Sequence, residues 1–508
     1  MGKTNIIILS GFVLLKFLLH YFLIAPEYDL QRDEFLHLDQ ANHLAFGFAS
    51  VPPLISWISW IIKLLGNSIF WIKFFPVLFG ALTIVVTWAT ISELKGNLYA
   101  RILGATCVLF SVLLRLNTLY QPNSFDVLCW TATFFFLIKY INTDHSKWIY
   151  GTAIVFALGF LNKYNIIFLA LGVAPALMIT KSRGLFLRKE IYLAIALALL
   201  IVSPNLIWQY QNGFPVFHHL NELADSQLVH VSRTLFLKNQ LLFFTGSIVV
   251  VISALYGLLF SEYFKKFRFL FWAFLFILSL FTYLKAKDYY AIGLYPAYIA
   301  IGSVYLCRIT DCTFGKIIKP ILVMVPVLLF ILSFNVAFPN KTPAYIISRQ
   351  DTYKALGLLR WEDGKDHEIP QDYADMLGWK ELAAKTDKAY LFLNDPERTL
   401  VLCDNYGQAG AINFYSEHGI KAVSFTADYI NWFDLEKEYT HLIRVKNAWE
   451  RAQELMETSP YFEHSVISDS VTTKYAREFG TTIFIFQGSK VDINKRIEEE
   501  LNPIKDRR

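Results

Sequence analysis

Two adjacent carboxylates, Asp33 and Glu34, follow closely on the first membrane-length apolar segment of the chain. After them the sequence returns to an apolar, aromatic helical pattern over residues 35–48 and then reaches the pair Pro52-Pro53. This order predicts a loop that lies back on the membrane surface. A carboxylate held at such an interface, with little water around it, can act as a general base. Asp33 is therefore the candidate base, and Glu34 is a second catalytic candidate that would orient Asp33 or tune its basicity.

Two more ionisable residues stand at the predicted ends of apolar segments. Asp126 closes the polar stretch of residues 121–126 and begins a span, which makes it a second acidic or metal-binding candidate. The alternative is a carboxylate that caps the helix and meets its dipole. Lys163 lies in a short polar break, where it could meet a phosphate or simply extend its ammonium group to the interface. Both pairs of alternatives stay open from the sequence.

Lysine and tyrosine gather in the short connection of residues 285–290. Ammonium groups supply charge and phenols supply hydrogen bonds, which suits a phosphate head group whose lipid tail stays in the bilayer. The alternative is an ordinary interfacial belt, which uses the same residue types. The candidates for binding a donor phosphate are Lys287, Lys285, Lys163, Tyr289 and Tyr290, and those for an acceptor site or functional loop are His218, His219 and Asp288.

The elements that must position these residues are membrane helices. Of the 508 residues 55% are hydrophobic and only 18% are charged, far more apolar than a soluble core requires. The expected fold is a polytopic α-helical membrane protein with about eleven spans by length. These spans are predicted near residues 5–25, 69–92, 99–116, 125–141, 148–161, 166–180, 191–208, 239–260, 269–284, 290–307 and 317–338.

Basic residues concentrate in alternate connections, around residues 93–101, 139–147, 181–189, 265–268 and 308–319. By the positive-inside rule these connections face the cytoplasm. An odd number of spans then places the loops with the candidate residues, and the C-terminus, on the outer (periplasmic) side of a bacterial inner membrane. The loss of one span, most easily from the short pair at 148–161 and 166–180, would break this parity. The first span is interpreted as an uncleaved signal anchor.

From about residue 340 charged residues become frequent and no further membrane-length apolar run occurs. The predicted division is a transmembrane domain, residues 1–339, and an outer α/β domain, residues 340–508. Strands are predicted at 389–393, 399–403, 421–425, 441–445 and 481–486, with helices at 378–386 and 448–458. The glycine-containing turn at 405–411 could present backbone N–H groups to an anion. For the domain as a whole a lid or acceptor-docking role is favoured.

Only one of the five cysteines, Cys403, lies in the predicted outer domain, so no disulfide is expected within it. No Cys/His cluster has the spacing of a zinc site. The net charge of +5 is accounted for by the basic connections, and nothing in the sequence indicates a nucleic-acid partner.

Taken in order, these pieces resemble the GT-C glycosyltransferases, in the bacterial branch related to protein O-mannosyltransferases and the lipid A aminoarabinose transferase. The resemblance implies transfer of a sugar from a polyprenyl-phosphate donor to a lipid, glycan or protein acceptor, with Asp33 in the position of the catalytic carboxylate. Many relatives have an acidic residue before the proline pair, where this chain has Ser50-Val51, so the sugar or acceptor can differ. The matching pieces are Asp33-Glu34 with Gly47 and Val51-Pro52-Pro53, Phe125-Asp126, Leu161-Asn162-Lys163-Tyr164, residues 204–213, residues 285–290 and Tyr295-Pro296.

The reaction expected from these residues is a single displacement with inversion. Asp33 accepts the proton of the acceptor, and the lipid phosphate leaves unprotonated with its charge met by Lys287, assisted by Lys163 or Lys285, so one base suffices. A divalent cation bridging carboxylates and phosphate is compatible with the sequence, which does not decide it. The main alternative is a membrane transporter or lipid flippase, although no internal repeat with broken helices is found. A scaffold that only anchors the C-terminal domain would not need so many spans.

Overall fold

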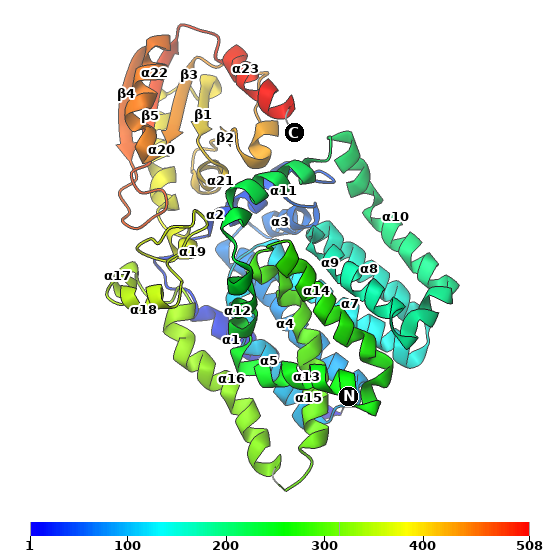
Figure 1. Ribbon diagram of the computed structural model, residues 1–508. Coiled ribbons are helices and arrows are strands. Elements are labelled where there is room, and N and C mark those ends of the chain that lie inside the picture. The colour runs from blue at the N-terminus through cyan, green and yellow to red at the C-terminus, as the bar shows by residue number, and fades with distance from the viewer. Residues whose placement is uncertain (1, 314, 507–508) are drawn as a thin grey trace.

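The computed structural model describes residues 2–313 and 315–506, which form a helical body and a smaller α/β part (Figure 1). The helical body runs from α1 (Lys3–Tyr21) to α16 (Gly315–Ala337), and the sheet lies beyond it in the chain. In Figure 1 the sheet sits at one end of the body, with the short helices α2 (Arg32–Asp39) and α11 (Pro215–Ser226) at the junction. The segment that carries Asp33 and Glu34 therefore lies where the two parts meet.

Six helices in the described part of the chain are long and apolar enough to cross a membrane, or up to eight if each bent helix pair counts as one span. Several of the expected spans coincide with shorter helices, such as α5 (Leu98–Leu109) with 12 residues. A helix of that length rises only about 18 Å, against a hydrocarbon core about 30 Å thick. The count of about eleven spans therefore stays a prediction. The six long helices are α1, α4 (Ile69–Glu93), α7 (Pro122–Thr143), α10 (Lys189–Gln211), η7 with α15 (Asp288–Ile309) and α16.

Shorter helices complete the body and flank the sheet. They are α3 (Leu54–Leu64), α6 (Leu113–Leu116), α8 (Ser146–Asn162), α9 (Ile167–Met178), α12 (Arg233–Phe243), α13 (Ile248–Phe260), α14 (Arg268–Tyr283), α17 (Pro343–Ile347), α18 (Gln350–Ala355), α19 (Gln371–Ala374), α20 (Trp379–Leu393), α21 (Tyr406–Tyr415), α22 (Arg451–Thr458) and α23 (Ile493–Asp506).

The C-terminal part contains a five-stranded mixed sheet of order β2-β1-β3-β5-β4. The central β1 (Thr399–Cys403) pairs in parallel with β2 (Ala422–Ser424) and β3 (His441–Lys446). On the other side β5 (Thr482–Ser489) is antiparallel to both β3 and β4 (Phe462–Ser470). A small sheet combined with helices confirms the α/β character predicted for this region.

Two secondary-structure predictions in this region are wrong. Residues 389–393 lie inside helix α20 and not in a strand, because so short an apolar run fits a buried helical turn as well as a strand. Strand β4 was not predicted because its apolar residues, Phe462, Val466 and Ile467, do not alternate regularly with polar ones. The other four strand predictions coincide with β1, β2, β3 and β5.

Aromatic packing fixes α2 against the C-terminal part. The fully buried ring of Phe35 contacts Trp379 of α20 and Phe414 and Tyr415 of α21, with ring centroids 5.6–5.9 Å apart. Helix α21 can approach this closely because Gly410 faces Phe35, where a Cβ atom would lie 2.8 Å from the Phe35 Cβ. Burial of such rings is among the larger contributions to packing. The first turn of α2 is thus held rigidly between the helical body and the sheet region.

Candidate active site

A cavity of about 2270 Å³ lies at the junction of the two parts. The polar portion of its lining comes from the start of α2, the loop before α7, the break between α8 and α9, and the loop before η7 (Asp288–Leu294). The apolar portion comes largely from α12 and α16, which contribute residues such as Leu242, Phe243, Phe330 and Leu332. The loops that the sequence assigns to one side of the membrane therefore converge on one cavity, with room for both a polar head group and an apolar chain.

Asp33 lines this cavity from the first turn of α2. The helix begins there because Gln31 and Glu34 form a capping box, in which each side chain accepts a hydrogen bond from the other end of the turn. The Asp33 carboxylate accepts one hydrogen bond from the Tyr406 hydroxyl at 2.7 Å and another from Gln121 Nε2 at 3.1 Å. Its two oxygens are therefore held from opposite parts of the chain.

Glu34 is outside the cavity lining and is fully buried. Its carboxylate accepts hydrogen bonds from Lys73 Nζ and from the backbone N–H of Tyr120, both at 2.6 Å, in addition to the capping contact. A buried carboxylate requires such a partner, and these contacts occupy both of its oxygens. Glu34 therefore anchors the start of α2, and its expected role of orienting or tuning Asp33 stays a prediction.

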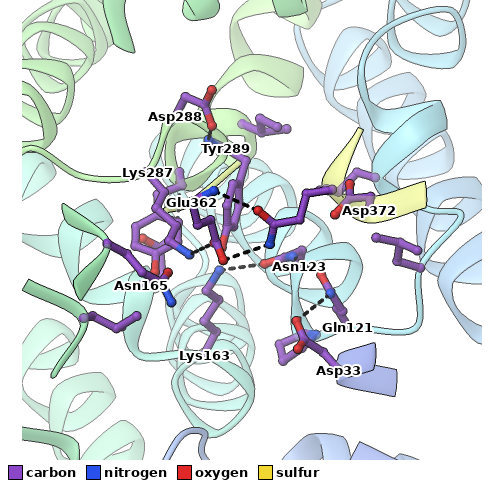
Figure 2. A pocket seen from close by; sticks show the side chains of 18 of the residues that line it. Asp33, Gln121, Asn123, Lys163, Asn165, Lys287, Asp288, Tyr289, Glu362 and Asp372 are labelled. Carbon is purple, nitrogen blue, oxygen red and sulfur yellow. Dashed lines mark hydrogen bonds and ion pairs between the residues drawn. The ribbon is translucent and has the colours of Figure 1, made fainter. Parts of the chain in front are cut away.

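A chain of hydrogen bonds connects Asp33 to Lys163 (Figure 2). Gln121 donates to Asp33 and accepts at 2.9 Å from Asn123 Nδ2, whose own carbonyl oxygen accepts from Lys163 Nζ at 2.6 Å. The ammonium of Lys163 also lies over the rings of Tyr290 and Tyr289, 4.3 and 5.0 Å from their centroids. Among the described residues Lys163 therefore contacts neutral groups, and no carboxylate lies within ion-pair distance of its ammonium, although the charge of the buried Asp126 acts on it from farther away.

Asp126 is buried behind this cluster and does not line the cavity. Its carboxylate accepts hydrogen bonds from Trp130 Nε1 at 3.1 Å and from Asn165 Nδ2 at 3.0 Å. Asn165 also donates to the backbone carbonyl of Tyr290, so Asp126 helps to hold the break after α8 against the loop before α15. Helix α7 begins at Pro122, so Asp126 does not cap it as the alternative supposed, and its assignment as an acidic or metal-binding candidate stays a prediction.

Lys287 lines the cavity but is already paired. Its ammonium donates to Glu362 Oε1 at 2.6 Å, and Glu362 is held in turn by Gln371 Nε2 at 3.1 Å. Burial has the largest single effect and would lower the pKa of Lys287, but the charge and hydrogen bond of Glu362, together with Tyr290 and Asp33, raise that pKa above its ordinary value. Any anion that binds Lys287 must therefore compete with the Glu362 carboxylate.

The remaining candidates from the sequence are placed differently. Asp288 lines the cavity and accepts from Asn239 Nδ2 at 2.6 Å, which ties η7 to α12. Lys285 is absent from the lining and has a left-handed backbone (φ 52°) just after α14, so it belongs to the turn. His218 and His219 line the cavity from α11, and their assignment to an acceptor site or functional loop stays a prediction.

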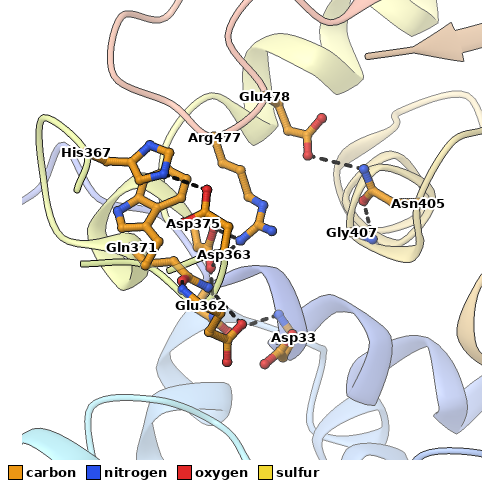
Figure 3. A network of polar contacts seen from close by, with 12 residues as sticks. Asp33, Glu362, Asp363, His367, Gln371, Asp375, Asn405, Gly407, Arg477 and Glu478 are labelled. Carbon is orange, nitrogen blue, oxygen red and sulfur yellow. Dashed lines mark hydrogen bonds and ion pairs between the residues drawn. The ribbon is translucent and has the colours of Figure 1, made fainter. Parts of the chain in front are cut away.

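Several residues at the cavity come from the C-terminal part and were not among the sequence candidates. Tyr406 begins α21 and binds Asp33, while Asp375 follows α19 and pairs with Arg477 at 3.0 Å (Figure 3). Burial raises the pKa of Asp375 to about 7, a larger effect than the opposing charges of Arg477 and Arg32. The only sequence signal for Asp375 is a carboxylate set among apolar residues at 373–379.

The strand–turn–helix order predicted around residues 405–411 is present, but the turn is only residues 404–405, and Gly407 and Gly410 lie inside α21. However, the side chain of Asn405 accepts hydrogen bonds from the N–H groups of Gly407 and Gln408 at 3.0 and 3.1 Å, as Figure 3 shows in part. These N–H groups are therefore already satisfied and are not offered to an external anion. Among the described residues no group of three or more His, Cys, Asp or Glu side chains could hold a metal ion. The expected divalent cation thus has no identified ligand set in that part of the chain.

Comparisons with known proteins bear on this architecture. A family model described as dolichyl-phosphate-mannose-protein mannosyltransferase matches residues 50–208. A curated relative, lipid A galacturonosyltransferase RgtD from Rhizobium johnstonii, is 25% identical over 228 residues, which is 44% of this chain and 46% of the relative. The chain therefore spans about half the length of the curated relative that it matches.

The solved structures cover far more of the chain. The crystal structure of ArnT from Cupriavidus metallidurans bound to undecaprenyl phosphate covers 97% of this chain and 99% of its own, with a TM-score of 0.64 at 13% identity. The apo structure of the same protein gives a TM-score of 0.63 at 14% identity, over 96% of this chain and 99% of its own. The resemblance to the GT-C glycosyltransferases is confirmed. The shared fold extends over the helical body and the α/β part alike.

Proposed function

We propose that this chain is an integral membrane glycosyltransferase that moves a hexosyl or pentosyl group from a polyprenyl-phosphate donor to an acceptor. The observation that carries the proposal is the chain of hydrogen bonds from Asp33 to Lys163 inside a cavity with an apolar extension. It sets a carboxylate suited to a base and a cation suited to a phosphate in one polar cluster. The GT-C fold, and a structural relative bound to undecaprenyl phosphate, support the choice of donor.

The proposed reaction is a single displacement. The acceptor hydroxyl or amine transfers its proton to the Asp33 carboxylate while its oxygen or nitrogen forms a bond to the anomeric carbon. The bond from that carbon to the phosphate oxygen breaks, and the configuration is inverted. Because the phosphate leaves without being protonated, the reaction requires a general base but no general acid. Tyr406 and Gln121 hold Asp33 in orientation through its two oxygens.

The lipid phosphate is assigned to Lys163, with Tyr289 and Tyr290 beside it. Lys163 has no carboxylate in contact, so binding an anion there displaces only an amide hydrogen bond. Lys287 is the second cation of this group, and it becomes available when its contact with Glu362 opens. The apolar lining from α12 and α16 would accommodate the first isoprene units of the donor.

The direct test uses full-length protein in lipid nanodiscs, with undecaprenyl-phosphate sugars bearing hexosyl or pentosyl head groups and with lipid A as a first acceptor. We expect release of undecaprenyl phosphate and a product of inverted anomeric configuration by NMR, both abolished in Asp33→Asn. A transporter would move the labelled donor between leaflets with its sugar–phosphate bond intact. Movement of intact donor, with no cleavage of any donor tested, would favour the transporter over the glycosyltransferase.

We also propose that the cavity and the C-terminal part lie on the outer side of a bacterial inner membrane. The basic connections support this orientation, because they alternate along the chain with the loops that line the cavity. A reporter that is active only in the periplasm, fused after the last residue, should be active. Activity of a cytoplasm-only reporter at the same position would reverse the orientation.

A further inference from the structure

Arg32 directly precedes the candidate base and faces the same cavity. Its guanidinium carbon lies 4.2 Å from the centroid of the Tyr406 ring, so the cation is stacked on the residue that also holds Asp33. Within residues 2–313 and 315–506 no group accepts a hydrogen bond from the Arg32 side chain, and its Nε atom is buried without a partner. An arginine at a cavity wall whose N–H groups have no acceptor in the protein can donate hydrogen bonds to a ligand.

Three other cations of the cavity have hydrogen-bond partners, and a fourth, Arg360, lines the cavity as an exposed side chain. Arg115 donates to Asp372 at 2.9 Å and Lys287 donates to Glu362, while Lys163 donates to an amide oxygen. The carboxylates whose charges act on Arg32 are Asp33, Asp375 and Glu478. Each has partners of its own: Asp33 accepts from Tyr406 and Gln121, Asp375 pairs with Arg477, and Glu478 accepts from Gln408 and Asn405. Because burial raises the pKa of Asp375 to about 7, this group is also only partly ionised at neutral pH.

Arg32 and Lys163, which among the described residues have no carboxylate in hydrogen-bond contact, flank Asp33 on different sides. Tyr406, on which Arg32 stacks, holds one oxygen of Asp33, and Gln121, which leads to Lys163, holds the other. If Lys163 receives the leaving phosphate, Arg32 is left for a second anion near the attacking group or the sugar ring. A guanidinium suits this role because its planar fork binds a carboxylate or phosphate through two parallel hydrogen bonds.

We propose that Arg32 is a specificity-determining residue that binds an anionic group on the substrate, either a carboxylate of the transferred sugar or a phosphate of the acceptor. This inference rests on the proposed function, since it divides the anions of one reaction between Lys163 and Arg32. Stacking on Tyr406 fixes the plane of the guanidinium, so recognition depends on the fork as well as on the charge.

The test measures equilibrium binding to full-length protein for two matched pairs of probes. The donor pair is undecaprenyl-phosphate galacturonate and undecaprenyl-phosphate galactose, which differ only in the charge at C6. The acceptor pair is lipid A with its phosphates and the dephosphorylated molecule. We expect Arg32→Gln to reduce the preference for the anionic member of one pair by about 10-fold to 100-fold, as a charge-assisted hydrogen bond predicts. The pair that responds identifies the source of the anion.

Two further variants keep the test decisive. Arg32→Lys retains the charge without the fork and should retain only part of the preference, which also answers the question if Arg32→Gln fails to fold. Arg349→Gln is the matched control, because Arg349 also stacks on a tyrosine, 5.1 Å from the Tyr345 ring centroid, but is exposed and outside the cavity lining. It should leave both preferences unchanged.

The inference is overturned if wild-type protein prefers neither anionic probe, or if Arg32→Gln and Arg32→Lys leave both preferences intact. Failure of the proposed function gives a different result: neither lipid-phosphate donor binds to wild type at all. In that case the acceptor pair alone decides whether Arg32 recognises an anion. A purely structural role for Arg32 would lower binding of both members of each pair equally and would also overturn the inference.

Discussion

The two walls of the cavity differ in whether their charged side chains are paired with an opposite charge. The wall formed by membrane helices presents Lys163, which contacts only an amide and two aromatic rings. The wall formed by the C-terminal part presents Glu362, which neutralises Lys287, and Tyr406, which holds Asp33. One wall therefore keeps a cation available for a ligand, whereas the other supplies groups that restrain the residues facing it.

This difference indicates a division of labour. The groups proposed to bind the donor phosphate come from loops between membrane helices, so the lipid tail of the donor can stay in the bilayer. Of the two groups that hold the base, Tyr406 comes from the C-terminal part, 373 positions from Asp33, whereas Gln121 belongs to a loop of the helical body. The α/β part is therefore better described as completing the site than as a lid that merely covers it.

The largest expected effect comes from the residue that both walls share. Asp33→Asn keeps the shape of the side chain and removes its basicity, so sugar transfer should fall by about 10²–10⁴-fold with folding retained. Glu34→Gln should act differently, because it breaks a buried contact with Lys73 and should cost about 3–5 kcal/mol of stability. Turnover per folded molecule and thermal stability separate the two. Near wild-type turnover in Asp33→Asn would refute the assignment of the base.

How much of this site could be predicted from the sequence follows from the separation of its parts. The sequence could select Asp33, Lys163, Tyr289 and Tyr290 as candidates because each stands at the polar end of an apolar segment, and the structure brings all four to the cavity, while their roles stay predictions. Tyr406 could not be selected, because one tyrosine among 27 has no local pattern that would mark it as a partner of Asp33.

The ion pair between Lys287 and Glu362 could not be predicted from the sequence either. Glu362 lies in a turn 75 positions further along the chain, and the residues around it do not indicate which lysine it contacts. The fold class could be predicted because a long apolar run inside a membrane must satisfy its own backbone hydrogen bonds, and an α-helix does this. The number of spans could not, since runs shorter than the bilayer thickness can lie within a helical body without crossing it.

The second prediction sets the two lysines of the cavity against each other. Lys163→Met should raise the donor KM by about 10-fold to 100-fold, because a charge-assisted contact to the phosphate is lost. Lys287→Met should have a smaller effect, because the ammonium it removes is already engaged by Glu362. A suitable control is Lys139→Met, which removes a lysine stacked 3.9 Å from the Trp148 ring centroid and outside the cavity. Equal effects at Lys163 and Lys287 would erase the proposed contrast between the walls.

The third prediction concerns the contribution of the C-terminal wall to the base. Tyr406→Phe keeps the ring on which Arg32 stacks but removes the hydrogen bond to Asp33, so kcat should fall by about 10-fold while the donor KM stays unchanged. The matched control is Tyr415→Phe, in the same helix, where the hydroxyl donates to Asp29 at 2.8 Å and away from the cavity lining. Loss of activity in both variants to the same degree would indicate a general effect on folding of α21.

The smallest expected effect tests whether Glu362 competes with the donor. Burial has the largest single effect and would raise the pKa of Glu362, but the charge and hydrogen bond of Lys287, together with Gln371 and Arg477, hold that pKa below its ordinary value. The carboxylate is therefore ionised at pH 6–8, and the contact weakens only as the pH falls through the folded-state pKa. Glu362→Gln should free Lys287 and lower the donor KM. The change should be only about 2-fold to 5-fold, since the Glu362 side chain is 45% exposed and such pairs are weak.

Salt dependence distinguishes this competition from a change of shape. In wild type, added salt screens the contact between Lys287 and Glu362 as well as the contact with the donor, whereas in Glu362→Gln it screens only the donor. The donor KM should therefore rise more steeply with ionic strength in Glu362→Gln than in wild type. Glu397→Gln, which loses an exposed pair with Lys437 outside the cavity, should follow the wild-type curve. An unchanged or higher donor KM in Glu362→Gln would mean that Glu362 orients Lys287 for the phosphate instead of withholding it, and the C-terminal wall would then assist donor binding.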